Sequence, residues 1–198
     1  MKKFAFLVLV VLSAFKTNAQ DGFNLYALGN KEMNEGNYRK AEEYYLAAYT
    51  KEPQNWNILT QLGYCYHRQL KFRAADSVLN IACLQDSTNS KPFWYKGMNH
   101  VKLKQDSMVV VCYKKFLDIE KKHNGNLTLG YKNVGWAYER LIKSEGLYSW
   151  QIDDMIYHFE QLERIDPMMP DIPNIQNFIE IVKAKRPANQ TGKWKLTL

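Results

Sequence analysis

A spacing of 34 residues recurs along the first half of the chain and constrains the fold more than any other feature. Glycine recurs at this offset at Gly29, Gly63 and Gly97. Apolar or small residues recur at the same offset in three further pairs, which are Ala41 with Ala75, Tyr45 with Leu79, and Ala48 with Ala82. An internal period of about 20 to 50 residues indicates repeats that bury their apolar faces by stacking. We therefore expect a solenoid.

The residue types at these offsets predict helices in close contact. Two antiparallel helices approach closely where side chains are small, and Gly29 with Ala41 and Gly63 with Ala75 are small. Larger residues are expected to fill the space around each contact, namely Leu28, Tyr45, Leu62 and Leu79. The predicted unit is a pair of helices.

The pattern resembles the tetratricopeptide repeat, a 34-residue helix–turn–helix unit. Residues 22–55 match it at Leu28-Gly29, Ala41, Tyr45, Ala48 and Pro53, and residues 56–89 at Leu62-Gly63, Tyr66, Ala75, Leu79 and Ala82. Residues 90–127 keep Phe93, Gly97 and Tyr113, and residues 128–169 keep Tyr131, Val134-Gly135 and Tyr138. The resemblance covers residues 20–169 and implies an all-α, TPR-like helix–turn–helix solenoid of about four repeats.

The later repeats are longer than the period. The step from Gly97 to Gly135 predicts four extra residues near Lys121–Leu127. The step from Gly135 to Pro167 is longer than that from Gly29 to Pro53 and predicts eight extra residues in the turn around Ser144–Trp150. Residues 170–185 are expected to form a C-terminal capping helix, since Ile172, Ile175, Phe178, Ile179 and Val182 follow helical spacing. Residues 186–198 form a predicted polar tail with one apolar patch, Trp194–Leu198.

The first 19 residues have the layout of a signal peptide. Lys2 and Lys3 precede the apolar run Phe4–Phe15, which is too short to span a bilayer, and Thr17-Asn18-Ala19 provides a cleavage site. Cleavage after Ala19 is expected to give a periplasmic or secreted bacterial protein with no stable membrane span. A lipid anchor is not expected, because no cysteine lies near the cleavage point. The alternative is an uncleaved membrane anchor.

Charge argues against a nucleic-acid partner. The formal net charge is +7, and removal of Lys2, Lys3 and Lys16 with the signal peptide leaves +4. The remaining lysines alternate with acidic residues, which is typical of a solvated surface.

The sequence contains no strong catalytic or metal-binding motif. Cys65, Cys83 and Cys112 occupy core positions of the repeats. Asp154 and His158 are four residues apart on one helix face, but two ligands do not make a metal site, and we interpret them as a solvated pair. Phosphate loops, nucleophile elbows and zinc-protease motifs are absent from the sequence. We expect no enzyme activity, no catalytic residue, no metal and no cofactor.

The resemblance implies that the first helices of the repeats line a concave groove that binds peptides. The positions carried over from the family hold aromatic and basic residues, and the predicted partner-binding set is Tyr26, Asn30, Tyr64, Arg68, Lys91, Trp94, Met98, Lys132 and Trp136. Aromatic side chains interleaved with cations suit peptide capture. The alternative is that some of these aromatic residues belong to the core.

Some members of the family clamp a peptide C-terminal carboxylate with lysine, asparagine and arginine. The five corresponding positions here are Tyr26, Asn30, Gln61, Lys91 and Tyr95. Asn30 and Lys91 match the clamp, but its paired cations are missing, and recognition of chaperone tails is not expected. The sequence predicts an exported scaffold or adaptor that binds a peptide or protein in an aromatic groove. The alternatives are an envelope enzyme or metal-binding protein, using Asp154 and His158 or the cysteines, and a structural spacer without a groove ligand.

Overall fold

The computed structural model describes residues 21–123 and 127–197. The predicted signal peptide, its cleavage site and Gln20 lie outside the described residues. The chain divides into two compact units, one up to Asn99 and one from His100 onward, which we call unit 1 and unit 2. The all-α prediction is confirmed, because the described part of the chain consists of helices and short connections with one isolated β-bridge.

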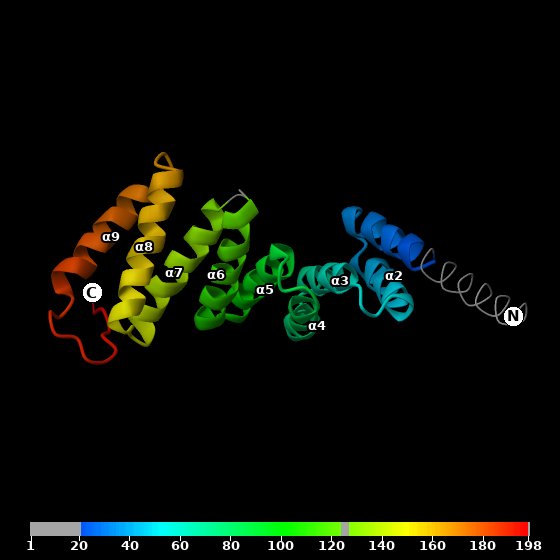
Figure 1. Ribbon diagram of the computed structural model, residues 1–198, viewed down its shortest axis with the longest axis horizontal. Coiled ribbons are helices and arrows are strands. Elements are labelled where there is room, and N and C mark those ends of the chain that lie inside the picture. Colours follow the sequence, from blue (N-terminus) through cyan, green and yellow to red (C-terminus); the bar gives the residue numbers. More distant parts are fainter. Residues whose placement is uncertain (1–20, 124–126, 198) are drawn as a thin grey trace, which may run out of the picture. The chain divides into compact units, whose positions relative to one another are not determined.

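Unit 1 is built from short helices of nearly equal length (Figure 1). A helix over residues 21–34 is followed by α2 (Tyr38–Lys51), α3 (Trp56–Arg68), α4 (Phe72–Gln85) and the first residues of α5 (Ser90–Leu103). Helix α3 packs against both α2 and α4. Its buried cluster consists of Ala41, Tyr45, Ala48, Ile58, Leu62 and Cys65.

The glycines of the repeat lie at close helix contacts, as the sequence predicts. A Cβ atom added at Gly63 would lie 2.4 Å from Leu79 Cγ, and one added at Gly29 would lie 2.6 Å from a ring carbon of Tyr45. In unit 2 a Cβ at Gly135 would lie 2.4 Å from a ring carbon of Phe159. Each glycine therefore accommodates a large side chain from the second helix of its pair.

Unit 2 contains the longer helices α6 (Asp106–His123), α7 (Thr128–Ser144) and α8 (Ser149–Ile165), which have 17 or 18 residues, and the 14-residue helix α9 (Ile172–Lys185). Helix α7 packs against α6 and α8, and α8 packs against α9 (Figure 1). The five apolar residues predicted for the capping helix are the buried residues of α9. Among the described residues, no helix is long and apolar enough to cross a membrane.

The prediction that eight extra residues lie in the turn around Ser144–Trp150 is wrong. The turn between α7 and α8 spans four residues, one more than the turn between α3 and α4. Helices α7 and α8 each contain 17 residues, whereas α3 contains 13 and α4 contains 14. The extra residues therefore lengthen the helices by about one turn each, which preserves their buried faces.

The C-terminal tail is more ordered than its polar composition suggests. Trp194 forms an antiparallel bridge with Leu147 of the α7–α8 turn, and Leu196 is buried. The three cysteines are free and buried, which agrees with their predicted core positions. Burial raises the pKa of the Cys83 thiol to about 11 and also raises the pKa of Cys65.

Candidate functional site

Three tyrosines on successive first helices of unit 1 form a cluster that we call the tyrosine row, defined by Tyr26, Tyr64 and Tyr95. The rings of Tyr64 and Tyr95 are stacked, with centroids 4.5 Å apart and an interplanar angle of 9°. Burial raises the pKa of Tyr95, and its neighbours Tyr64 and Tyr26 raise it further. All three side chains are half-buried, so the row combines a fixed geometry with an accessible surface.

Tyr45 of α2 supports the row from the core. It is fully buried, its ring centroid lies 6.0 Å from that of Tyr26, and its hydroxyl donates a hydrogen bond of 2.9 Å to Asn30 Oδ1. Burial, with Tyr26, Cys65 and Tyr95 nearby, raises the pKa of Tyr45, so its hydroxyl stays protonated and continues to donate. The side-chain oxygen of Asn30, a predicted partner-binding residue, therefore already accepts a hydrogen bond from Tyr45.

Two exposed cations lie on the tyrosines. Arg68 donates a hydrogen bond of 3.0 Å to the Tyr64 hydroxyl, and its guanidinium lies 4.8 Å from the ring centroid of Tyr38. Lys91 Nζ lies 5.9 Å from the ring centroid of Tyr95. Cation–π contacts of this kind hold a charge over a ring face. Tyr38 was missed by the sequence reasoning because it lies at the start of a second helix, outside the predicted groove positions.

Helix α5 brings the remaining unit 1 residues, Trp94 and Met98, which are both half-buried. A buried polar contact fixes this helix, because Asn99 donates to the Phe72 carbonyl oxygen at 2.8 Å and lies 3.3 Å from His67 Nδ1. Unit 1 thus brings together the tyrosine row and the two cations from α3 and α5.

The two predicted site residues of unit 2, Lys132 and Trp136, each contact another residue of the same unit. Lys132 Nζ lies 2.6 Å from Asp171, which precedes α9. The indole of Trp136 is half-buried and packs edge-to-face on Phe159, with centroids 5.5 Å apart. Phe159 in turn contacts Phe178 of the capping helix. Both predicted residues therefore take part in holding α7 to α8 and α9.

The interpretation of Asp154 and His158 as a solvated pair is wrong. Asp154 Oδ2 accepts hydrogen bonds from Lys114 Nζ at 2.6 Å and from the Tyr138 hydroxyl at 2.7 Å. His158 is buried and its Nδ1 lies 2.6 Å from the Asp154 carbonyl oxygen. The two residues occupy one end of a polar cluster that joins α6, α7 and α8, with Lys121 and Tyr157 nearby.

Both groups of the pair have shifted pKa values. Burial opposes ionisation of Asp154, but hydrogen bonds from Lys114 and Tyr138 hold the pKa of that carboxyl below its usual value. Burial lowers the pKa of His158, and Lys114 and Lys121 lower it further, against the opposing effect of Asp154. Across the described ranges, no group of three or more histidine, cysteine or acidic residues is arranged to hold a metal ion.

Comparison with known proteins identifies the fold through solved structures. No protein-family model matches the chain, and no curated protein matches it by sequence. The MamA crystal structure has a TM-score of 0.69 at 16% identity, with 84% of this chain and 85% of MamA covered. A tetratricopeptide repeat protein from Parabacteroides merdae has a TM-score of 0.67 at 18% identity, with 83% of this chain and 61% of that protein covered.

A third similar structure contains a bound peptide. The first TPR domain of Spaghetti (RPAP3), bound to the HSP90 peptide SRMEEVD, has a TM-score of 0.58 at 23% identity, with 62% of this chain and 94% of that domain covered. The chain therefore has the tetratricopeptide-repeat fold that its sequence pattern resembles.

Proposed function

We propose that this chain is an exported, non-enzymatic adaptor that holds a segment of a partner protein on the tyrosine row of unit 1. The observation that carries the proposal is the parallel stack of Tyr64 on Tyr95, with Arg68 and Lys91 placed beside the rings. Aromatic side chains that are half-buried and fixed by their neighbours lose little entropy on binding, and such residues dominate the energetics of protein interfaces.

The cations define the kind of segment that the row accepts. Arg68 and Lys91 are exposed, so they favour a partner with carboxylates beside an apolar or aromatic side chain. Exposed charges at the rim of an interface act mainly on the association rate and its salt dependence. The tyrosines are expected to supply most of the binding free energy.

The proposed ligand differs from the HSP90 peptide bound by the similar RPAP3 domain. Of the five clamp positions, Asn30 and Lys91 match, and Asn30 Oδ1 is already hydrogen-bonded to Tyr45. Tyr26 and Tyr95 stand where the clamp requires a lysine and an arginine. We therefore expect SRMEEVD to be a poor ligand, with a dissociation constant above about 1 mM.

Export is part of the proposal and rests on the sequence. Lys2 and Lys3, the short apolar run and Thr17-Asn18-Ala19 favour cleavage after Ala19. Processed protein from the native host is expected to have the mass of a chain that starts at Gln20. Recovery of a full-length, membrane-embedded form would contradict this part of the proposal.

Partner capture from the native host tests the binding site. Tyr64→Ala is expected to weaken capture by about 2 kcal/mol, or roughly thirtyfold, because it removes half of the stack. Trp150→Ala in unit 2 is the control, since Trp150 is an exposed aromatic residue outside the tyrosine row, and it should bind normally. Arg68→Ala is expected to weaken capture mainly at low salt. Circular dichroism checks that each variant stays helical.

The expected result for Trp136 follows from its packing. Because its indole contacts Phe159, Trp136→Ala is expected to lower stability more than it lowers capture. Normal capture by Tyr64→Ala, or loss of capture by the Trp150→Ala control alone, would place the partner on another face.

A further inference from the structure

Residues 187–197, which we call the strap, fold back from the end of α9 to the α7–α8 turn. The Trp194 N–H donates to the Leu147 carbonyl oxygen at 2.8 Å, and the Leu147 N–H donates to the Trp194 carbonyl oxygen at 2.9 Å. The Leu196 N–H donates to the Ile142 carbonyl oxygen at 3.0 Å, and Gln190 Nε2 donates to the Leu147 carbonyl oxygen at 2.7 Å. The end of α7 and the turn after it thus present main-chain groups to an extended segment.

The strap side chains alternate as they do in an extended segment with one packed face. Trp194 is half-buried and Leu196 is 3% exposed, whereas Lys195 and Thr197 are exposed. Gly146 has a positive φ of 78°, and a Cβ added there would lie 3.0 Å from the Trp194 carbonyl group. Gly146 therefore provides the space in which the strap backbone approaches the turn.

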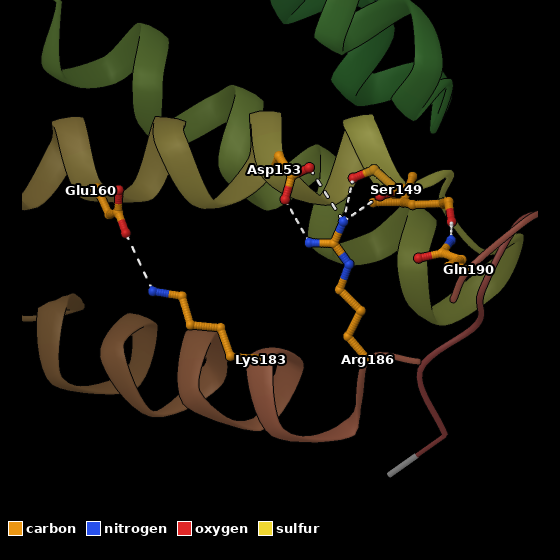
Figure 2. A network of polar contacts seen from close by, with 7 residues as sticks. Ser149, Asp153, Glu160, Lys183, Arg186 and Gln190 are labelled. Atoms are coloured by element: carbon orange, nitrogen blue, oxygen red, sulfur yellow. Dashed lines mark hydrogen bonds and ion pairs between the residues drawn. The ribbon is translucent and has the colours of Figure 1, made fainter. Parts of the chain in front are cut away.

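The root of the strap is fixed firmly. Figure 2 shows the Arg186 guanidinium reaching α8, where Nη1 bonds to Asp153 Oδ1 at 2.5 Å and Nη2 bonds to Ser149 Oγ at 2.5 Å. Lys183, one turn earlier, forms a longer contact of 3.4 Å with Glu160. The helix is anchored up to Arg186, so any opening of the strap begins at Pro187.

The first residues of the strap, directly beyond this root, are exposed. Pro187, Ala188 and Asn189 are exposed, and with Arg186 and Ser149 they border a hollow of about 440 Å³. Gln190 Oε1 is buried and has no hydrogen-bond partner within the described parts of the chain. The strap buries Leu196 and part of Trp194, whereas α9 buries five apolar side chains. Segments with less buried apolar surface open locally at lower free energy than core helices.

We propose that the end of α7 and the α7–α8 turn, from Ile142 to Leu147, form a peptide-binding site whose resident ligand is the strap. The site takes an extended segment by main-chain pairing and selects apolar side chains at alternate positions, as strand addition does elsewhere. The strap dissociates from this site and binds it again while the helices stay folded. This site lies in unit 2 and does not depend on the function proposed for the tyrosine row.

A peptide added to the full-length chain tests the site. The probe is a fluorescein-labelled peptide with the sequence of residues 190–197, and its binding is followed by fluorescence anisotropy. In the full-length variant Trp194→Ala/Leu196→Ala the resident ligand is disabled, and we expect the probe to bind this variant at least tenfold more tightly than the unaltered chain. The control variant, Lys195→Ala/Thr197→Ala, changes two exposed positions of the strap and is expected to resemble the unaltered chain. A probe with alanine at positions 194 and 196 is expected not to bind.

Three results would overturn the proposal. Equal binding of the probe to the variant and to the unaltered chain would mean that the peptide binds elsewhere. A helical variant that binds no probe would mean that the turn does not recognise the segment. Loss of the helical circular dichroism signal in the variant would mean that the strap is an integral part of the fold and does not open independently.

Discussion

In unit 1 the first helices place tyrosines against one another, whereas in unit 2 the aromatic residue of the first helix, Trp136, packs on Phe159 of α8. The cations differ in the same way. Arg68 and Lys91 lie over tyrosine rings at the surface, but Lys132 and Arg140 form ion pairs with Asp171 and Asp106. Residues of the first helices thus contact one another in unit 1, whereas in unit 2 they contact α8 and the residue that precedes α9.

Helix length explains part of this difference. Helices α7 and α8 of unit 2 are about one turn longer than α3 and α4 of unit 1, and unit 2 also contains the capping helix and the strap. The ion pair between Lys132 and Asp171 joins α7 to the start of α9. Unit 1 does not include the capping helix α9. The partner site proposed above therefore lies in unit 1, whereas the predicted site residues of unit 2, Lys132 and Trp136, contact Asp171 and Phe159 of the same unit.

The largest expected effect is on the stability of the close helix contact at a glycine, which both units contain. Gly63→Leu and Gly135→Leu each force a bulky side chain into a contact where a single Cβ would already lie 2.4 Å from its neighbour. Each is expected to lower the free energy of unfolding by about 3 kcal/mol, as overpacked cores do. Thermal or urea unfolding measures the effect, and Gly192→Ala is the control because no atom lies within 4 Å of its added Cβ. An unchanged melting temperature for one leucine variant would mean that the glycine contact in that unit is not tightly packed.

The glycine positions could be predicted because they recur at a fixed offset, but the helix lengths could not. Adding about one helical turn leaves the buried face in register, so the repeat pattern at Tyr131, Gly135 and Tyr138 looks the same whether extra residues extend a helix or a turn. The sequence therefore located the extra residues between Gly135 and Pro167 without showing which element contains them.

The candidate site was partly predictable for a similar reason. The tyrosine row follows from positions within single repeats, since Tyr26 and Tyr64 belong to the predicted partner-binding set and Tyr95 is one of the clamp positions. The partners that tie down the residues of unit 2 are far away in sequence, since Asp171 lies 39 residues from Lys132 and Asp154 lies 40 residues from Lys114. Spacing within a repeat cannot predict such contacts. The pairs are found only in the structure, where the packed helices bring these charges together.

The second prediction concerns the polar cluster that distinguishes unit 2. Asp154 Oδ2 accepts from both Lys114 and Tyr138 and so connects α6, α7 and α8. Asp154→Asn removes the charge that strengthens these bonds and is expected to cost about 2 kcal/mol of stability. Glu160→Gln on the same helix is the matched control, because its pair with Lys183 is exposed and should be worth less than about 1 kcal/mol. Equal melting temperatures for the two variants would mean that the cluster does not stabilise unit 2.

The smallest predicted effect is a pH dependence of α8 in unit 2. Because the folded-state pKa of His158 lies below the ordinary value of 6.5, protons bind the unfolded chain more readily at this residue. The stability that depends on neutral His158 is therefore fully present above about pH 6.5 and is lost as pH falls from there toward the folded-state pKa. The pKa of Asp154 is shifted below 3.8, so its contribution remains above about pH 4 and does not obscure the histidine.

Hydrogen exchange at pH 7 and pH 5, corrected for the intrinsic rate, should separate the units. We expect peptides from α8 to lose protection at pH 5, while peptides from α2, which contains no histidine, keep theirs. His158→Gln should abolish the loss, since glutamine does not titrate. Lys121→Gln should reduce it, because Lys121 is one of the cations that lower the pKa of His158. Lys122→Gln is the control for the removal of a neighbouring exposed charge. If α2 loses protection as α8 does, or if His158→Gln keeps the same pH dependence, the titrating group lies outside the α6–α7–α8 cluster. The contrast between the two regions would then not extend to their response to acid.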